Sequence, residues 1–297
     1  QKIGPFTVKP ELIMSAPSVS FEFFPPKTAE AEASLWRSVE RLAPLSPAFV
    51  SVTYGADGST RERTHKVIER ILAETTLEAV PHLTCVGASK DEVNELADSY
   101  WHLGIRHLVA LRGDAEGEAD ANYVPHDNGY AYASDLVEGL LVRHPFELIV
   151  AAYPETHPQA LSAEADLENL RRKVDAGARR AITQFFFDNA VFLKFRDRVA
   201  AAGIDVELIP GILPVTNYKT LARFADQCGT SLPQSLSDLF VGLDDDPTTR
   251  QQIAAHVAVS QAETLGREGV RNFHFYTLNR ADLSYTVCHA LGVRGTK

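Results

Sequence analysis

Short apolar runs alternate along the chain with longer segments in which apolar residues recur at helical spacing. Such alternation is typical of repeated strand–helix units around a parallel sheet. The runs that we interpret as strands number eight: Val19–Phe24, Phe49–Thr53, Ala79–Cys85, His107–Leu111, Glu147–Tyr153, Ala181–Phe187, Val206–Leu213 and Asn272–Leu278. Eight such units predict an α/β fold, a closed (β/α)8 or TIM barrel.

Segments rich in Ala, Leu, Glu and Arg separate these runs and are expected to form the outer helices. They lie at Glu30–Leu42, Arg61–Glu74, Lys90–Leu103, Ala133–Arg143, Ala163–Ala176, Ala190–Ala202, Tyr218–Gln227 and Thr248–Arg267. The composition of Ala281–Gly292 predicts one extra C-terminal helix that packs outside the barrel.

Residues that end and begin helices support these boundaries. Gly104, Gly177 and Gly203 each follow a helical pattern, where a glycine with positive φ can end a helix. Asp246 stands directly before Pro247, which predicts an N-cap for the last long helix. We therefore prefer a cap to a metal site as the interpretation of this acidic stretch.

We find no internal repeat, linker or low-complexity tract that would divide the chain. Residues 1–17 have no usable periodicity and stay unassigned, and residues 18–297 are expected to form one catalytic barrel domain. The composition, 45% hydrophobic and 23% charged, is that of a globular protein. Disordered, collagen-like and fibrous classes are thereby excluded.

The net charge and the cysteines indicate which binding partners and which cellular compartment to expect. The 29 Lys and Arg against 39 Asp and Glu give a net charge of −10, which disfavours binding to nucleic acid. No apolar run is long enough to suggest a membrane span, and no signal peptide opens the chain. Three widely separated cysteines form no disulfide or zinc pattern, so we expect a cytoplasmic protein.

Polar residues interrupt or follow most of the predicted strands. In such barrels the active site forms where the strands end, so these residues are the candidates for chemistry. They are Glu22, Thr53, Tyr54, His82, Arg112, Gly113, Asp114, Tyr153, His157, Thr183, Gln184, Asn279 and Arg280. Their number favours a shared site over isolated core residues.

Glu22 is the sharpest of these signals. It is flanked by Phe21 and Phe23, and a desolvated carboxyl favours its protonated form, as a general acid needs. The alternative is a buried ion pair with a nearby arginine. Asp114 is the second candidate carboxylate, and for it a salt bridge with Arg112 is an equally good interpretation.

The sequence contains neither a GxGxxG fingerprint after a strand nor a P-loop motif. One helix could hold ribose and pyrophosphate instead, because Asp166, Asn169, Arg172 and Lys173 fall on one face at helical spacing. A solvated charged face is the alternative. The histidines show no HExxH or close His/Cys grouping, so no metal site is expected.

Several long motifs resemble one known family. They are FEFFPPK (Phe21–Lys27), VSVTYGADGSTRERT (Val50–Thr64), HLTC (His82–Cys85), ALRGD (Ala110–Asp114), YASDL (Tyr132–Leu136), AAYPETHP (Ala151–Pro158), RKVDAGARRAITQFFFD (Arg172–Asp188), GIDVELIPGILPV (Gly203–Val215), GLDDD (Gly242–Asp246) and HFYTLNRA (His274–Ala281). In this order they resemble the bacterial 5,10-methylenetetrahydrofolate reductases from about Val19 to Val293. The resemblance implies a single FAD-binding (β/α)8 barrel.

The resemblance also implies the reaction, reduction of 5,10-methylenetetrahydrofolate to 5-methyltetrahydrofolate for methionine synthesis. NADH or NADPH and the folate would use the same flavin face in turn, a ping-pong scheme in which FAD supplies the hydride chemistry. By resemblance the catalytic residues are Glu22, which assists protonation of N10, together with Asp114 and Gln184. The partners are small molecules, and a homo-oligomer is expected.

The resemblance assigns contacts residue by residue. FAD contacts would be Tyr54, Ala56, His82, Arg112, Gly113, Asp114, Tyr132, Ala133, Tyr153, His157, Ala160, Asp166, Asn169, Arg172 and Lys173. Substrate contacts would be Thr53, Asp114, Gln184, Thr220, Phe224 and Arg280. The chain departs from the family pattern between Asp114 and Tyr132, and at Thr220, where a longer amide is expected.

Two other functions stay open from the residues alone. The first is a cofactor-free barrel lyase or hydrolase in which Glu22 and Asp114 form an acid/base pair. The second is a barrel that binds its ligand without turnover. The preference between NADH and NADPH, the oligomeric state and the preferred polyglutamate length of the folate are not encoded in any motif that we recognise.

Overall fold

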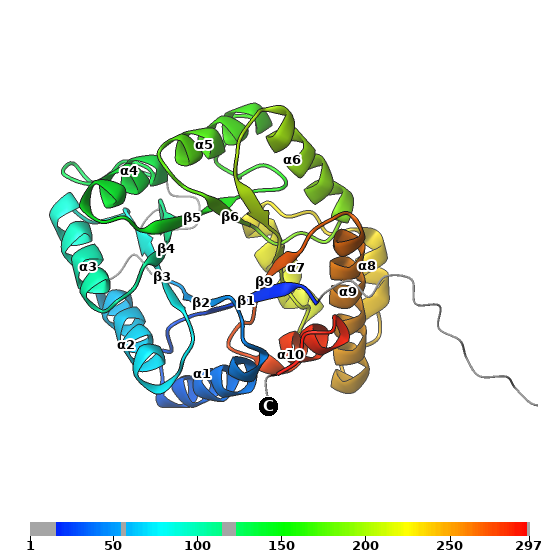
Figure 1. Cartoon of the computed structure of the whole chain (residues 1–297). Coiled ribbons are helices and arrows are strands. Elements are labelled where there is room, and N and C mark those ends of the chain that lie inside the picture. Colours follow the sequence, from blue (N-terminus) through cyan, green and yellow to red (C-terminus); the bar gives the residue numbers. More distant parts are fainter. Residues whose placement is uncertain (1–15, 55–57, 115–122, 296–297) are drawn as a thin grey trace, which may run out of the picture.

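The sheet of this protein closes on itself almost completely (Figure 1). The structure is a computed structural model that describes residues 16–54, 58–114 and 123–295. Its parallel strands are β1 (Ser18–Phe23), β2 (Phe49–Val52), β3 (Ala79–Thr84), β4 (His107–Leu111), β5 (Glu147–Ala152), β6 (Arg180–Thr183), β7 (Glu207–Ile209), β8 (Gly211–Ile212) and β9 (Asn272–Tyr276). Their order in the sheet is β7-β6-β5-β4-β3-β2-β1-β9-β8.

The seventh predicted strand is divided into β7 and β8 by Pro210. β7 pairs with β6, whereas β8 pairs with β9, and the Pro210 carbonyl accepts a hydrogen bond from the His274 N–H at 3.0 Å. Proline has no N–H group to donate to a ladder, so the pairing changes from one neighbour to the other at this residue. The predicted (β/α)8 barrel is confirmed, with one strand in two parts.

The helices form a ring around the strands (Figure 1). They are α1 (Ala29–Leu42), α2 (Gly58–Glu74), α3 (Lys90–His102), α4 (Ala133–Arg143), α5 (Ala163–Asp175), α6 (Asn189–Ala201), α7 (Tyr218–Cys228), α8 (Gln234–Phe240), α9 (Pro247–Arg267) and α10 (Ala281–Ala290). The extra helix α10 contacts α1 and α9 on the outside, as predicted. The seven-residue α8 and the 3-10 turn Ala43–Leu45 were not predicted.

The predicted helix ends are confirmed. Gly104, Gly177 and Gly203 have φ values of 90°, 125° and 67°, which L side chains rarely adopt. The Asp246 side chain accepts a hydrogen bond from the Thr249 N–H at 3.0 Å, and Pro247 opens α9. The acidic stretch before α9 therefore provides a cap.

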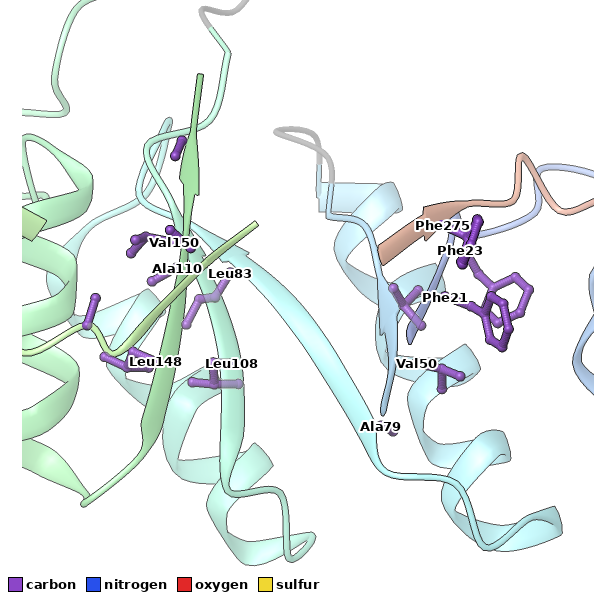
Figure 2. Close-up of a cluster of buried hydrophobic side chains, with 14 of the residues drawn as sticks. Phe21, Phe23, Val50, Ala79, Leu83, Leu108, Ala110, Leu148, Val150 and Phe275 are labelled. Carbon is purple, nitrogen blue, oxygen red and sulfur yellow. The ribbon is translucent and has the colours of Figure 1, made fainter. Parts of the chain in front are cut away.

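Two apolar layers follow from the alternation of side chains along each strand. Phe21, Phe23 and Phe275 are buried between the strands and the helices (Figure 2). A second cluster, inside the barrel, takes one residue from each of six strands: Phe49, Val80, Val109, Ile149, Ile182 and Ile209. Since Phe21 and Phe23 face the helices, Glu22 between them faces the barrel interior.

Among the described helices, none combines the length and the apolar character that a membrane crossing requires. All three cysteines, Cys85, Cys228 and Cys288, are free thiols.

Candidate functional site

A cavity of about 790 Å³ opens at the C-terminal ends of the strands and extends outward over α4 and α5. Its volume lies in the range of small-molecule sites, and its position is that of the active sites of (β/α)8 barrels. Most of the site residues predicted from the strand ends, from the helix face and from the family resemblance line it. They are Glu22, Thr53, Tyr54, His82, Arg112, Gly113, Asp114, Tyr132, Ala133, Tyr153, His157, Ala160, Asp166, Asn169, Arg172, Lys173, Gln184 and Phe224.

Four described residues among the predicted candidates are not part of this lining: Thr183, Thr220, Asn279 and Arg280. Thr183 and Asn279 are buried. Ala56 lies outside the described residues. Thr220 lies one turn before Phe224 on α7 and is exposed, with its N–H bonded to the Asn217 side chain at 3.0 Å. Arg280 is the exposed N-cap residue of α10.

The Glu22 carboxylate lies among histidines. Its Oε2 is 3.5 Å from His82 Nε2 and 3.6 Å from His274 Nε2. The side chain of Glu22 is 19% exposed, and it reaches the cavity. The arginine partner of the alternative ion-pair interpretation is not found among the described residues, so the carboxylate stays available to a ligand.

A hydrogen bond to the ring nitrogen that faces away from Glu22 fixes the side chain of His274. It is fully buried, and its Nδ1 forms a 2.8 Å hydrogen bond with Ser20 Oγ. Because β1 and β9 pair in parallel with Ser20 opposite His274 and Glu22 opposite Tyr276, these four side chains share the inner face of the barrel. The imidazole is therefore fixed with its Nε2 directed at the carboxylate.

Burial dominates the electrostatics around Glu22. It lowers the pKa of His82, and the neighbouring Glu22 carboxylate offsets this only in part. Burial also raises the pKa of Tyr276 well above its usual range, and its hydroxyl donates to the Thr183 carbonyl at 2.8 Å. The lowered pKa of His82 and the raised pKa of Tyr276 both favour the neutral form of the side chain.

Neither His274 nor Tyr276 was predicted as a site residue. The sequence did contain a signal for these two residues, because His274 and Tyr276, whose side chains carry polar atoms, alternate with phenylalanines along β9. With Phe273 and Phe275 on the helix side, His274 and Tyr276 must face inward. Their proximity to Glu22 depends on barrel closure, which joins segments more than 250 residues apart.

Asp114 and Arg112 do not form a salt bridge with each other in the described part of the chain. The Arg112 Nε donates to the Gly113 carbonyl at 3.0 Å, and its guanidinium lies 4.5 Å from the Tyr123 ring centroid. Asp114 is exposed at the cavity. Of the two interpretations of this carboxylate, the structure thus favours a ligand-facing one.

The predicted face of α5 does point at the cavity. Asp166 Oδ2 accepts a hydrogen bond from the His157 N–H at 2.9 Å, which ties the helix to the loop after β5. Asn169 and Arg172 are exposed, whereas Lys173 is buried, with its Nζ donating to the Ala151 carbonyl at 2.6 Å. Burial lowers the pKa of Lys173 to about 8.

An aromatic wall closes the other side of the cavity. Phe224 is 42% exposed and stacks on Phe185, with ring centroids 5.2 Å apart. Gln184, directly before Phe185, accepts the Phe185 N–H on its side-chain oxygen at 3.0 Å. A flat ligand entering here meets apolar rings and an amide.

Two buried polar atoms in the lining have no hydrogen-bond partner in the described residues. They are His82 Nε2 and Thr84 Oγ1. Unpaired buried polar atoms are costly, so their presence in a cavity wall indicates a place for a polar ligand.

No group of three or more His, Cys, Asp or Glu among the described residues has the geometry to hold a metal ion.

Comparisons with known proteins agree on one family. A family model described as methylenetetrahydrofolate reductase matches residues 9–292. The chain is 56% identical over 279 residues to a 5,10-methylenetetrahydrofolate reductase of Escherichia coli (strain K12), covering 93% of this chain and 91% of that protein. It is 54% identical, with the same coverage, to the protein of that name from Pectobacterium carotovorum subsp. carotovorum.

More distant matches are consistent with the barrel. Methylenetetrahydrofolate reductase (NADH) 1 of Zea mays is 33% identical over 285 residues, which are 92% of this chain and 48% of that protein. Among solved structures, a dihydropteroate synthase from Coxiella burnetii in complex with pteroic acid has a TM-score of 0.51 at 11% identity, covering 94% of this chain and 92% of that one. That similarity supports the fold alone.

Proposed function

Because the chain belongs to the methylenetetrahydrofolate reductase family, we propose that it reduces 5,10-methylenetetrahydrofolate to 5-methyltetrahydrofolate, with FAD as cofactor and NADH or NADPH as reductant. The two substrates would react in turn at one site, a ping-pong order. The product would supply methyl groups for methionine synthesis in the cytoplasm. Residues 18–297 would act as one catalytic domain, within a homo-oligomer.

The cavity fits the cofactor that the family implies. FAD is long and carries a pyrophosphate, and the cavity runs from the strand ends to α5, where Arg172 and Lys173 lie. Two negative phosphates are favoured near such cations. His82 Nε2 and Thr84 Oγ1, two buried atoms of the lining without a hydrogen-bond partner in the described residues, would be available to the polar atoms of the isoalloxazine ring. When bound, FAD would supply the hydride chemistry, which no amino-acid side chain provides.

Glu22 is the observation that carries the proposal. Opening the five-membered ring of the folate requires a proton at N10, and Glu22 is a carboxyl at the cavity wall with imidazoles at 3.5 and 3.6 Å. A general acid must lie within hydrogen-bond reach of the atom that it protonates. Asp114, exposed in the same cavity, would accept the two N–H donors at the amino end of the pterin.

The other side chains would bind and orient. Gln184 offers both a donor and an acceptor, which suits a site that two different ligands occupy in turn. Phe224 would stack on either ligand, and Thr53 would contact the nicotinamide nucleotide. Thr220 and Arg280 would have to act from outside the present lining, at the far end of the folate.

The cofactor content of the purified protein tests the proposal. We expect a yellow protein with absorbance near ~450 nm, as a flavin cofactor gives, and turnover of methylenetetrahydrofolate with a nicotinamide nucleotide. A protein that stays colourless after incubation with FAD, and that shows no such turnover, would contradict it.

A further inference from the structure

The loop between β9 and α10 has an unusual backbone. Leu278 and Asn279 have φ values of 50° and 54°, so two consecutive residues other than glycine occupy the left-handed region. Asparagine tolerates this region, but leucine does so poorly. Strained residues persist only where the surrounding contacts hold them, and they are frequent at functional sites.

The side chain of Asn279 supplies those contacts. Its Oδ1 accepts a hydrogen bond from the Phe24 N–H at 3.0 Å, and its Nδ2 donates to the Phe24 carbonyl at 2.8 Å. The amide thus pairs with both backbone groups of one residue, as a neighbouring strand would. Asn279 is only 5% exposed, so both bonds are shielded from water.

This pairing continues the β1–β9 ladder past its end. The ladder stops at Glu22 opposite Tyr276, and beyond it Thr277 donates to the Glu22 carbonyl through its N–H at 3.3 Å and its Oγ1 at 2.6 Å. Asn279 then holds Phe24, two residues after Glu22. The backbone of Glu22 is therefore fixed on its C-terminal side by Thr277 and Asn279, two residues that follow β9.

Asn279 is itself anchored to α1. Its carbonyl accepts hydrogen bonds from Ser38 Oγ at 2.8 Å and Ser34 Oγ at 3.4 Å, and its N–H donates to Thr277 Oγ1 at 3.1 Å. Every polar atom of Asn279 thus has a hydrogen-bond partner. The residue connects three elements, β1, β9 and α1, beside the cavity wall formed by Phe24, Thr277 and Leu278.

We propose that Asn279 is a positioning residue for Glu22. It does not line the cavity, and it acts through Phe24 and Thr277 to hold the carboxyl where a ligand meets it. This inference rests on the proposed role of Glu22 as the proton donor to the folate. Small displacements of a catalytic group slow a reaction strongly, so loosening this amide pair should slow the step that uses Glu22.

The variant Asn279→Gly tests this role, because glycine keeps the left-handed backbone but removes both amide hydrogen bonds. In the FAD-bound enzyme, reoxidation of the reduced flavin by methylenetetrahydrofolate should slow about tenfold or more. Reduction of the flavin by the nucleotide should stay unchanged. The matched control is Asn94→Ala on α3, which removes the side-chain oxygen that accepts a hydrogen bond from the Tyr130 hydroxyl and should leave both half-reactions unchanged.

Amide hydrogen exchange at residues 22–24 gives a second measurement that needs no turnover. Exchange should be faster in Asn279→Gly than in the unsubstituted enzyme and in Asn94→Ala. Unchanged exchange, or equal loss of both half-reactions together with loss of FAD, would overturn the positioning role. Failure of the unsubstituted enzyme to turn over the folate would contradict the proposed function instead, and the exchange measurement would still decide the role of Asn279.

If Asn279→Gly does not fold, Asn279→Asp takes its place. Aspartate tolerates the left-handed region and keeps the acceptor for the Phe24 N–H, but it places an oxygen against the Phe24 carbonyl. The same selective loss of the folate half-reaction is expected, with faster exchange at residues 22–24. No change in either measurement would overturn the proposal.

Discussion

The environment of Glu22 separates two roles that a carboxyl could have in this cavity. If it donates a proton to the folate, Glu22→Gln should slow the folate half-reaction by about 10²- to 10⁴-fold, the usual contribution of general acid catalysis. Reduction of the flavin by the nucleotide needs no such proton and should be retained. Stopped-flow absorbance under anaerobic conditions measures the two steps separately.

A second glutamate provides the control for this variant. Glu78 also contacts a histidine, His107, at 2.9 Å, but it lies before β3, at the opposite end of the barrel from the cavity. Glu78→Gln should leave both half-reactions intact. Equal losses in both half-reactions of Glu22→Gln would show that Glu22 binds or folds rather than donates a proton.

His82 should make stability depend on pH. Its pKa is lowered in the folded protein by burial, whereas the unfolded chain keeps a value near 6.5. As the pH falls below about 6.5, the unfolded state binds a proton that the folded state does not, so folding stability is lost. One pH unit below that value, the loss from one such histidine is at most about 1.4 kcal/mol, the limit set by protonation of the unfolded state.

The variant His82→Gln isolates this effect from the other titrating groups. Urea unfolding of the protein without FAD at pH 7.5 and pH 5.5 should show a smaller difference in the free energy of unfolding for the variant, by at most about 1.4 kcal/mol. An undiminished pH dependence would mean that His82 is protonated in the folded state.

At the residue scale, sequence could identify side chains but only part of their surroundings. Glu22 was predicted as an acid because of its phenylalanine neighbours, yet Phe21 and Phe23 pack on the helix side. The actual neighbours are His82 and His274, brought there by alternation and by barrel closure. Alternation can be read from one strand, whereas closure depends on the register between strands that are distant in sequence.

Among the elements, α5 carries two adjacent arginines with different roles. Arg172 is exposed at the cavity, whereas Arg171 Nη2 donates to the Ala202 carbonyl at 2.6 Å, away from it. Arg172→Gln should weaken FAD binding about tenfold, as expected for one charge-assisted contact. Arg171→Gln should lower stability but keep FAD affinity. Fluorescence titration of the protein without FAD measures both, and equal affinities would contradict the assignment of this face.

The loop after β4 needs a glycine for two reasons. Gly113 has a φ of 88°, and a Cβ there would lie 2.3 Å from Val86 Cγ1. Gly113→Ala should therefore cost about 3 kcal/mol from strain and overpacking together. Gly104 has a similar φ of 90° but open space around it, so Gly104→Ala should cost only about 1 kcal/mol. Urea unfolding compares the two, and equal costs would show that packing against Val86 is unimportant.

The elements that were predicted well are those with strong local signals. Helix α4 has the predicted bounds, and caps such as Asp246 and Gly177 mark others. The sixth run was predicted to Phe187, but β6 ends at Thr183, because Phe185 and Phe186 are buried without strand pairing. Helix α8 was missed because its seven residues are too short to show a helical period.

At the scale of the whole molecule, closure of the barrel creates the site. β1 pairs with β9, so the first and last strands lie side by side and their C-terminal ends meet at the cavity. This explains why Glu22, His274 and Asn279 act as one group although they are far apart in sequence. The protein carries a net charge of −10, so an anionic ligand needs a local source of positive potential. The cations at the cavity that provide it are Arg112, Arg172 and Lys173.

The anaerobic half-reactions of the FAD-bound protein test the central claim most directly. NADH and NADPH, each added alone, should establish which nucleotide bleaches the flavin absorbance, and methylenetetrahydrofolate added afterwards should restore it while 5-methyltetrahydrofolate forms. Recovery of the absorbance by the folate, without any nucleotide present, is the predicted result. A flavin that neither nucleotide reduces, or that stays reduced after the folate is added, would contradict the account.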